Sequence, residues 1–392
     1  MSPVRSSLVR VLSLALLTAC ATDAPRSGVS GGEVASTPKP VDTGAASAVD
    51  SAAAIGIPDA TANTPSAAPS TPSVAVTPSD VAANPAAGDS AAPRLAPGRP
   101  TKDATSFAAA IRAGNRKLAS WPTGPAPLPG ALLPKNRIIA YYGNPHSKKM
   151  GVIGEYPEQQ MLGMLDRTVA AWKAADPKTP IIPAIHLVTV VAQGAPGSDG
   201  MWRRRETPEM IERTYNWAKS KKGILFLDIQ ASHSTLQQEV PPLLKYLERP
   251  DVHLGVDPEF FMHYDKEGVR PSAKIGTMMA ADVNYVIRTL DKLVADKNLP
   301  PKILVVHRFT SRMVPDAEQI RPTSRVQVVM HMDGWGPPWL KFDSYKDYIV
   351  SHPVGYTGFK LFYHNDTKKS DALLTPPELL QLRPRLSYVQ YQ

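Results

Sequence analysis

Eight short apolar runs constrain the fold of this chain more than any other feature of its sequence. Each run is rich in β-branched and aromatic residues, and most are separated by longer stretches in which apolar residues recur at helical spacing. The runs cover residues 138–143, 181–191, 223–230, 252–261, 303–309, 326–332, 356–363 and 386–391. Eight strands that alternate with helices predict a (β/α)8 barrel over residues 131–392.

Helix start signals agree with this alternation. Thr207 and Thr375 each precede a proline, and Thr375 is followed by Glu378 in the spacing of a capping box. The third helix is expected to be interrupted, because Pro241 and Pro242 lie within it. An open doubly wound sheet is the alternative, although no glycine-rich phosphate loop follows the first run.

The first residues read as an export signal, which we assign to residues 1–19. Arg5 and Arg10 precede a short apolar segment, and this segment ends in Leu17-Thr18-Ala19-Cys20. The ending resembles the lipobox of bacterial lipoproteins. The resemblance implies that Cys20 is lipidated and anchors the chain to the cell membrane or the outer membrane, with the folded part outside the cytoplasm.

Residues 20–130 are expected to form a disordered tether. Residues 21–100 are dominated by small residues and proline and contain no aromatic residue, so they have too little apolar bulk to fold alone. A single helix is predicted within the tether at residues 103–120, where Phe107, Ala110, Ile111 and Leu118 form an approximate stripe.

The excess of positive charge lies in the part of the chain that is predicted to fold. The chain carries a formal net charge of +9, whereas residues 1–100 contain six basic and seven acidic residues. We interpret the excess as a basic, solvated surface, which would also suit anionic wall polymers or lipid head groups. We expect no nucleic-acid partner and no cofactor.

Polar residues gather at the carboxyl ends of the predicted strands, where barrel enzymes carry their chemistry. They are Tyr142, His186, Asp228, Gln230, Asp257, Glu259, His307, His331, Asp333, Lys360 and Tyr363. A lone polar residue at a strand end is commonly structural, but their recurrence on successive strands favours one site.

Asp257-Pro258-Glu259 is the sharpest element of this set. If the fourth strand continues through it, alternation places both carboxylates on the same face. Two adjacent carboxylates cannot both ionise freely, so the pKa of one rises and that group can donate a proton near neutral pH. Glycoside hydrolysis requires such an acid. We predict that Asp228 and Asp333 face this pair from neighbouring strands, as further catalytic residues.

The pair also resembles the end of the strand-four motif of chitinase-type and lysozyme-type barrels. The resemblance implies that Glu259 is the acid and that Asp257 orients an N-acetyl group of the substrate. The sequence departs from the chitinase pattern upstream of the pair, at Val252 and Gly255.

The predicted function is therefore hydrolysis of a cell-envelope or extracellular polysaccharide. Trp335 lies beside the sixth strand, and its flat ring suits the faces of sugars. The expected substrate-binding residues are Tyr142, His186, Gln230, His307, His331, Trp335, Lys360 and Tyr363.

Two other functions remain open at this point. Asp228, Asp257, Glu259, His307 and Asp333 could instead converge on a divalent cation in a metal-dependent hydrolase, although no local metal-ligand spacing is present. The barrel could also bind a glycan or a partner protein without catalysis.

Overall fold

The computed structural model describes residues 102–368 and 372–392. The predicted signal peptide, Cys20 and most of the predicted tether lie outside these residues. Within the described part of the chain, no helix is both long enough and apolar enough to cross a membrane.

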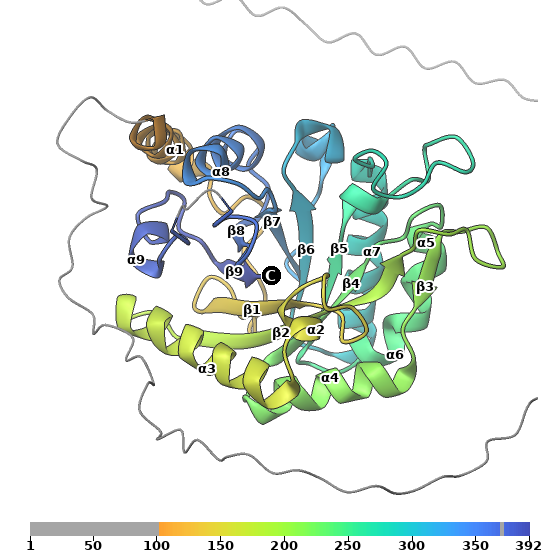
Figure 1. Cartoon of the computed structure of the whole chain (residues 1–392). Coiled ribbons are helices and arrows are strands. Elements are labelled where there is room, and N and C mark those ends of the chain that lie inside the picture. The colour runs from red at the N-terminus through yellow and green to blue at the C-terminus, as the bar shows by residue number, and fades with distance from the viewer. Residues whose placement is uncertain (1–101, 369–371) are drawn as a thin grey trace, which may run out of the picture. The chain divides into compact units, whose positions relative to one another are not determined.

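Eight parallel strands close into a barrel, as the sequence predicts (Figure 1). The first strand pairs in parallel with both the second and the last, and this pairing closes the sheet. The barrel strands are β1 (Arg137–Gly143), β2 (Ile181–Ala192), β4 (Ile224–Ile229), β5 (Val252–Val256), β6 (Lys302–Arg308), β7 (Val326–Met332), β8 (Tyr356–Leu361) and β9 (Tyr388–Tyr391). The fold is a (β/α)8 barrel of the TIM type.

A ninth strand, β3 (Arg203–Arg205), was not predicted. It pairs antiparallel with the last residues of β2, Val190 to Ala192. The buried carboxylate of Glu239 holds this strand, because it accepts hydrogen bonds from Arg203 at 2.7 Å and from Arg205 at 2.6 and 2.8 Å. The run of three arginines is therefore partly structural.

Helices surround the barrel on its outer face (Figure 1). The α-helices within the barrel domain are α2 (Val152–Glu155), α3 (Glu158–Ala175), α4 (Pro208–Ser220), α5 (Leu236–Glu239), α6 (Leu244–Leu247), α7 (Ala280–Lys297), α8 (Pro338–Ser344) and α9 (Pro376–Leu379). The predicted interruption of the third helix is confirmed, since a 3-10 turn at Pro241–Leu243 separates α5 from α6. The capping box is also present, and Glu378 accepts a 2.7 Å hydrogen bond from the Thr375 amide.

The helix predicted at residues 103–120 is present as α1 (Lys102–Lys117), followed by a 3-10 turn at Leu118–Ser120. It packs against α8: the Phe107 and Phe342 ring centroids are 4.8 Å apart, and Asp103 accepts a 2.9 Å hydrogen bond from the Trp339 amide. Residues from 102 onward therefore pack on the barrel, ahead of the predicted domain start at residue 131.

Side-chain alternation along the strands divides the interior in two. One set of side chains packs between the strands and the helices. The other set fills the half of the barrel lumen nearer the amino-terminal ends of the strands with apolar residues such as Ala140, Phe226 and Val305. Toward the carboxyl ends of the strands the lumen becomes polar.

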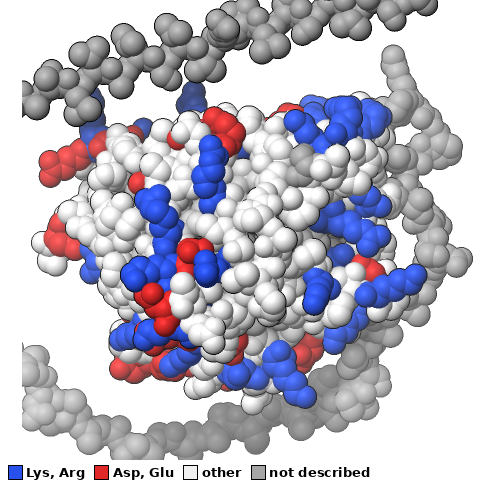
Figure 2. Space-filling model, turned by 180° about the vertical axis from the view of Figure 1, so that it is seen from behind, with Lys and Arg blue, Asp and Glu red and all other residues white. Residues whose placement is uncertain are grey.

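Charged residues are dispersed over the face that Figure 2 shows. Figure 2 shows small groups of Lys and Arg separated by uncharged residues and interspersed with Asp and Glu. This pattern agrees with the interpretation of the positive excess as a solvated surface.

Candidate active site

An open pocket of about 650 Å³ occupies the carboxyl-terminal mouth of the barrel. It is the place where barrel folds carry their chemistry. Its lining includes three carboxylates and several residues that the sequence predicts for ligand binding: Asp257, Glu259, Asp333, Tyr142, Gln230, Lys360 and Trp335.

A turn, rather than a strand, positions Asp257 and Glu259. The prediction that the strand runs through residue 261 is wrong: β5 ends at Val256, and residues 258–260 form a 3-10 turn. Pro258 cannot donate to a strand ladder, and Asp257 caps the turn by accepting a 3.1 Å hydrogen bond from the Glu259 amide. Strand alternation therefore does not determine which way the Asp257 and Glu259 side chains point.

The three carboxylates nevertheless converge. One oxygen from each of Asp257, Glu259 and Asp333 lies within 4.8 Å of the others. Asp333 follows β7 and is 5 % exposed, while Asp257 is 2 % exposed and Glu259 is half-buried. Their closeness and burial make their protonation states interdependent.

The surroundings separate the pKa values of these carboxylates. Burial, together with the charges of Asp257 and Asp333, raises the pKa of Glu259 to about 8. Burial also raises the pKa of Asp257 to about 7. Burial alone would raise the pKa of Asp333 too, but Lys360 at 2.8 Å and His307 hold it well below its usual range. Near neutral pH, Glu259 keeps its proton and Asp333 is ionised.

Polar neighbours hold the floor of the pocket in place. The Gln230 amide donates to Asp257 and to the Tyr142 hydroxyl, at 3.3 Å in each case. The Lys360 ammonium lies 3.9 Å from the centroid of the Tyr142 ring. These contacts connect four strand ends and fix the side chains that face the pocket.

A second group of predicted site residues lies deeper in the lumen. His186, Asp228, His307 and His331 are fully buried and are not part of the pocket lining. Asp228 lies between two histidines, 3.5 Å from the Nε2 atom of His186 and 3.5 Å from that of His307. Their burial excludes direct contact with a ligand in the pocket, so the predicted catalytic and binding roles do not follow from this arrangement.

Tyr363 does not face the pocket either. Its hydroxyl is 3.0 Å from that of Tyr141, on the outer side of the barrel wall. Phe362 lines the pocket at this strand end instead of Tyr363, together with Lys360, because positions 360 and 362 are two apart and alternate to the same side.

The sequence reading missed several lining residues. Phe309 and Phe362 carry the same alternation signal as His307 and Lys360, and that signal could have found them. Lys341 comes from α8, is 1 % exposed and pairs with Asp366 at 2.9 Å. No sequence spacing connects this lysine to the strand ends.

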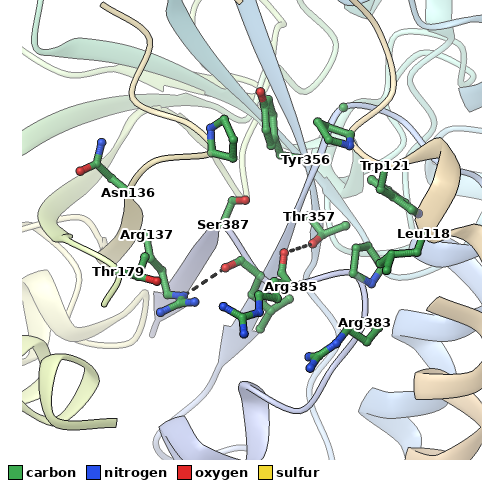
Figure 3. Close-up of a pocket in the computed structure, with 15 residues that line it drawn as sticks. Leu118, Trp121, Asn136, Arg137, Thr179, Tyr356, Thr357, Arg383, Arg385 and Ser387 are labelled. Atoms are coloured by element: carbon green, nitrogen blue, oxygen red, sulfur yellow. Dashed lines mark hydrogen bonds between the residues drawn. The ribbon is translucent and has the colours of Figure 1, made fainter. Parts of the chain in front are cut away.

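Another pocket, of about 360 Å³, lies at the opposite end of the barrel. Figure 3 shows Arg137, Arg383 and Arg385 around it, with Arg137 donating to the Leu386 carbonyl. Neither a carboxylate nor a histidine is among its lining residues in the described part of the chain. Acid–base chemistry therefore points to the mouth pocket.

Comparison with known proteins identifies no family for the chain. No family model matches the sequence, and no curated protein matches it. Among solved structures, the chain is similar to a ruminal GH26 endo-β-1,4-mannanase, at 12 % sequence identity and a TM-score of 0.30. The match covers 69 % of this chain and 64 % of that one. A likeness at this level does not bear on activity, which has to be argued from the site.

Proposed function

We propose that this protein is a glycoside hydrolase that acts on a cell-envelope or extracellular polysaccharide. The observation that carries the proposal is the group of three carboxylates at the floor of the mouth pocket, one of which is ionised while Glu259 retains its proton near pH 7. Carboxyl groups whose surroundings push their pKa values apart are the basis of acid catalysis at glycosidic bonds.

Each residue has a defined role in this proposal. Glu259 donates its proton to the leaving oxygen of the glycosidic bond, and water supplies the oxygen that ends on the anomeric carbon. Asp257, two positions before Glu259, orients the reacting sugar. Lys360 holds Asp333 ionised, so that its negative charge stabilises the positive charge that develops on the sugar ring. Trp335, which is 56 % exposed at the pocket, offers its ring as a platform for a further sugar unit.

The stereochemical outcome depends on the distance between the acid and the second carboxyl group. Retaining glycosidases place their two carboxyl groups about 5–5.5 Å apart, whereas inverting enzymes leave a gap of about 6.5–9.5 Å for water. One oxygen from each of Asp257, Glu259 and Asp333 lies within 4.8 Å of the others, and the first-formed anomer distinguishes the two outcomes.

The direct test is a screen of the full chain against peptidoglycan, chitin oligomers and other envelope glycans. We expect new reducing ends from at least one polymer, and the first-formed anomer can be followed by NMR. Binding without hydrolysis across this panel would favour a non-catalytic glycan-binding barrel. Neither binding nor hydrolysis would contradict both functions.

The pH profile supplies a further prediction. Glu259 must be protonated to act as the acid, and its protonated fraction falls as pH rises through about 8. We therefore expect kcat/KM on an uncharged glycan to fall about tenfold per pH unit above this value. Asp257→Asn removes one of the charges that raise the pKa of Glu259, so the decline should begin at a lower pH. Asp296→Asn, on the exposed face of α7, should leave the profile unchanged.

We further propose that Cys20 anchors the protein to a membrane facing its polymer substrate. The lipobox resemblance supports this proposal, and Cys20 is the only cysteine of the chain. In cells, Cys20→Ser should abolish incorporation of labelled palmitate and release the protein from the membrane fraction. Continued membrane association of the variant without label would contradict anchoring through this thiol.

A further inference from the structure

Three fully buried side chains below the mouth pocket form a cluster in which potential metal-ligand atoms face one another. Asp228 has both carboxylate oxygens without a hydrogen-bond partner among the described residues, and the facing Nε2 atoms of His186 and His307 also lack one. All three residues are 0 % exposed. Buried polar atoms without partners are costly, so four of them directed at one another require an explanation.

The other nitrogen of each histidine is already engaged. Nδ1 of His307 lies 2.9 Å from the carboxylate of Asp333, and Nδ1 of His186 lies 2.6 Å from the Tyr388 hydroxyl. Because a carboxylate only accepts, Nδ1 of His307 donates to Asp333, and the Nε2 atom on the other side of the ring faces Asp228. A divalent cation in place of the Nε2 protons would bind both Nε2 atoms and the Asp228 carboxylate together.

The distances within the cluster fit such an ion. Metal–ligand bonds of about 2.1 Å at tetrahedral angles place neighbouring ligand atoms about 3.4 Å apart. The two Nε2 atoms each lie 3.5 Å from an oxygen of Asp228. These separations are too long for strong hydrogen bonds, but they suit ligands of a shared ion.

A glycine lets β5 pass close to this cluster. Gly255 on β5 lies beside the cluster, and a Cβ atom at this position would come within 2.7 Å of Nε2 of His186. Any larger residue would displace the ligand atoms. Tyr142 covers the cluster from above, with its ring centroid 5.4 Å from that of His186 and 5.8 Å from that of His307.

We infer that His186, Asp228 and His307 form a binding site for a divalent first-row transition-metal ion such as Zn²⁺, in the barrel lumen beneath the mouth pocket. Two imidazoles and one carboxylate are borderline donors that suit this class of ion rather than Mg²⁺ or Ca²⁺. The Asp333 carboxylate and the Tyr388 hydroxyl orient the histidines from outside, as is usual for metal ligands. The inference does not depend on the proposed glycosidase activity.

The test measures metal content rather than activity. The full chain is incubated with Zn²⁺, dialysed against metal-free buffer and analysed by inductively coupled plasma mass spectrometry. We expect a single tightly held ion per chain, a rise in Tm on binding, and nitrogen and oxygen neighbours without sulfur at the zinc absorption edge. Substitution of Co²⁺ should give the visible bands of a tetrahedral nitrogen and oxygen site.

Matched variants locate the ion. His307→Gln and Asp228→Asn should each abolish tight binding and the rise in Tm. His253→Gln changes another fully buried lumen histidine, whose Nδ1 accepts from the Ile303 amide, and it should retain the ion. His146→Ala combined with His364→Ala removes two exposed histidines that lie beside Glu206 and Glu155, and it should also retain the ion.

Two results would overturn the inference even if a lumen variant failed to fold. The wild-type chain could hold no stoichiometric Zn²⁺ or Co²⁺ after dialysis, or its ion could be lost in the exposed-histidine variant. Equal loss of the ion in folded His253→Gln and His307→Gln would also contradict the assignment, because binding would then reflect general integrity of the lumen.

Discussion

Glu259→Gln should reduce the turnover of a glycan substrate by about 10²- to 10⁴-fold, which is the usual contribution of a positioned general acid. The amide has nearly the same shape as the carboxylic acid but carries no transferable proton. Because Glu259 is half-buried at the pocket wall, the substitution should leave both the fold and the glycan affinity close to wild type.

Single-turnover kinetics and calorimetric binding on the same glycan separate these effects. Glu248→Gln is a suitable control, since Glu248 forms an exposed ion pair with Lys297 away from the pocket. Turnover that survives in Glu259→Gln at the wild-type rate would remove Glu259 from the mechanism. Loss of binding along with turnover would indicate a role in holding the ligand.

Lys360→Met should lower the free energy of unfolding by about 3–5 kcal/mol, the range expected when one partner of a buried ion pair is removed. The partner is Asp333: the side chains of Lys360 and Asp333 are each 3 % exposed, and their charged groups lie 2.8 Å apart. Of the two ion-pair partners of Asp333 among the described residues, only His307 then remains. Methionine fills a similar volume, so the loss reports the charge rather than a cavity.

Denaturant unfolding followed by circular dichroism measures this loss. Adding Asp333→Asn to Lys360→Met should recover part of it, because the double variant no longer buries an unpaired charge. Lys292→Met removes an exposed i,i+4 pair with Asp296 and should change stability by less than about 1 kcal/mol. A similar small change in Lys360→Met would mean that water reaches Asp333.

The architecture was predictable because the strands and helices of a barrel alternate regularly along the sequence. Each of the eight apolar runs contributes a barrel strand, because a parallel strand that is buried on both faces requires a nearly continuous apolar segment. The helix at residues 103–120 was also predictable, but its partner was not. Packing of Phe107 on Phe342 joins residues that no local pattern connects.

The residue types of the candidate site were predictable, but the position of each residue along the barrel axis was not. Strand ends identified Asp257, Glu259 and Asp333, yet the turn after Val256 depends on the backbone chemistry of Pro258 rather than on periodicity. Sequence position along a strand also does not give height in the lumen, because tilted strands are staggered. His186 and His307 therefore lie below the pocket, although their runs resemble the others.

The closure of the barrel through β1, β2 and β9 has a consequence for biogenesis. β9 is the last of the eight strands to be synthesised, and until it is available the edges of β1 and β8 remain unpaired. Tyr388, which contacts His186, arrives on the same strand. A nascent chain that lacks β9 would thus present two open sheet edges and an incomplete lumen, and would be prone to aggregation. We expect the barrel to acquire its closed interior in one late step, when β9 pairs with both β1 and β8.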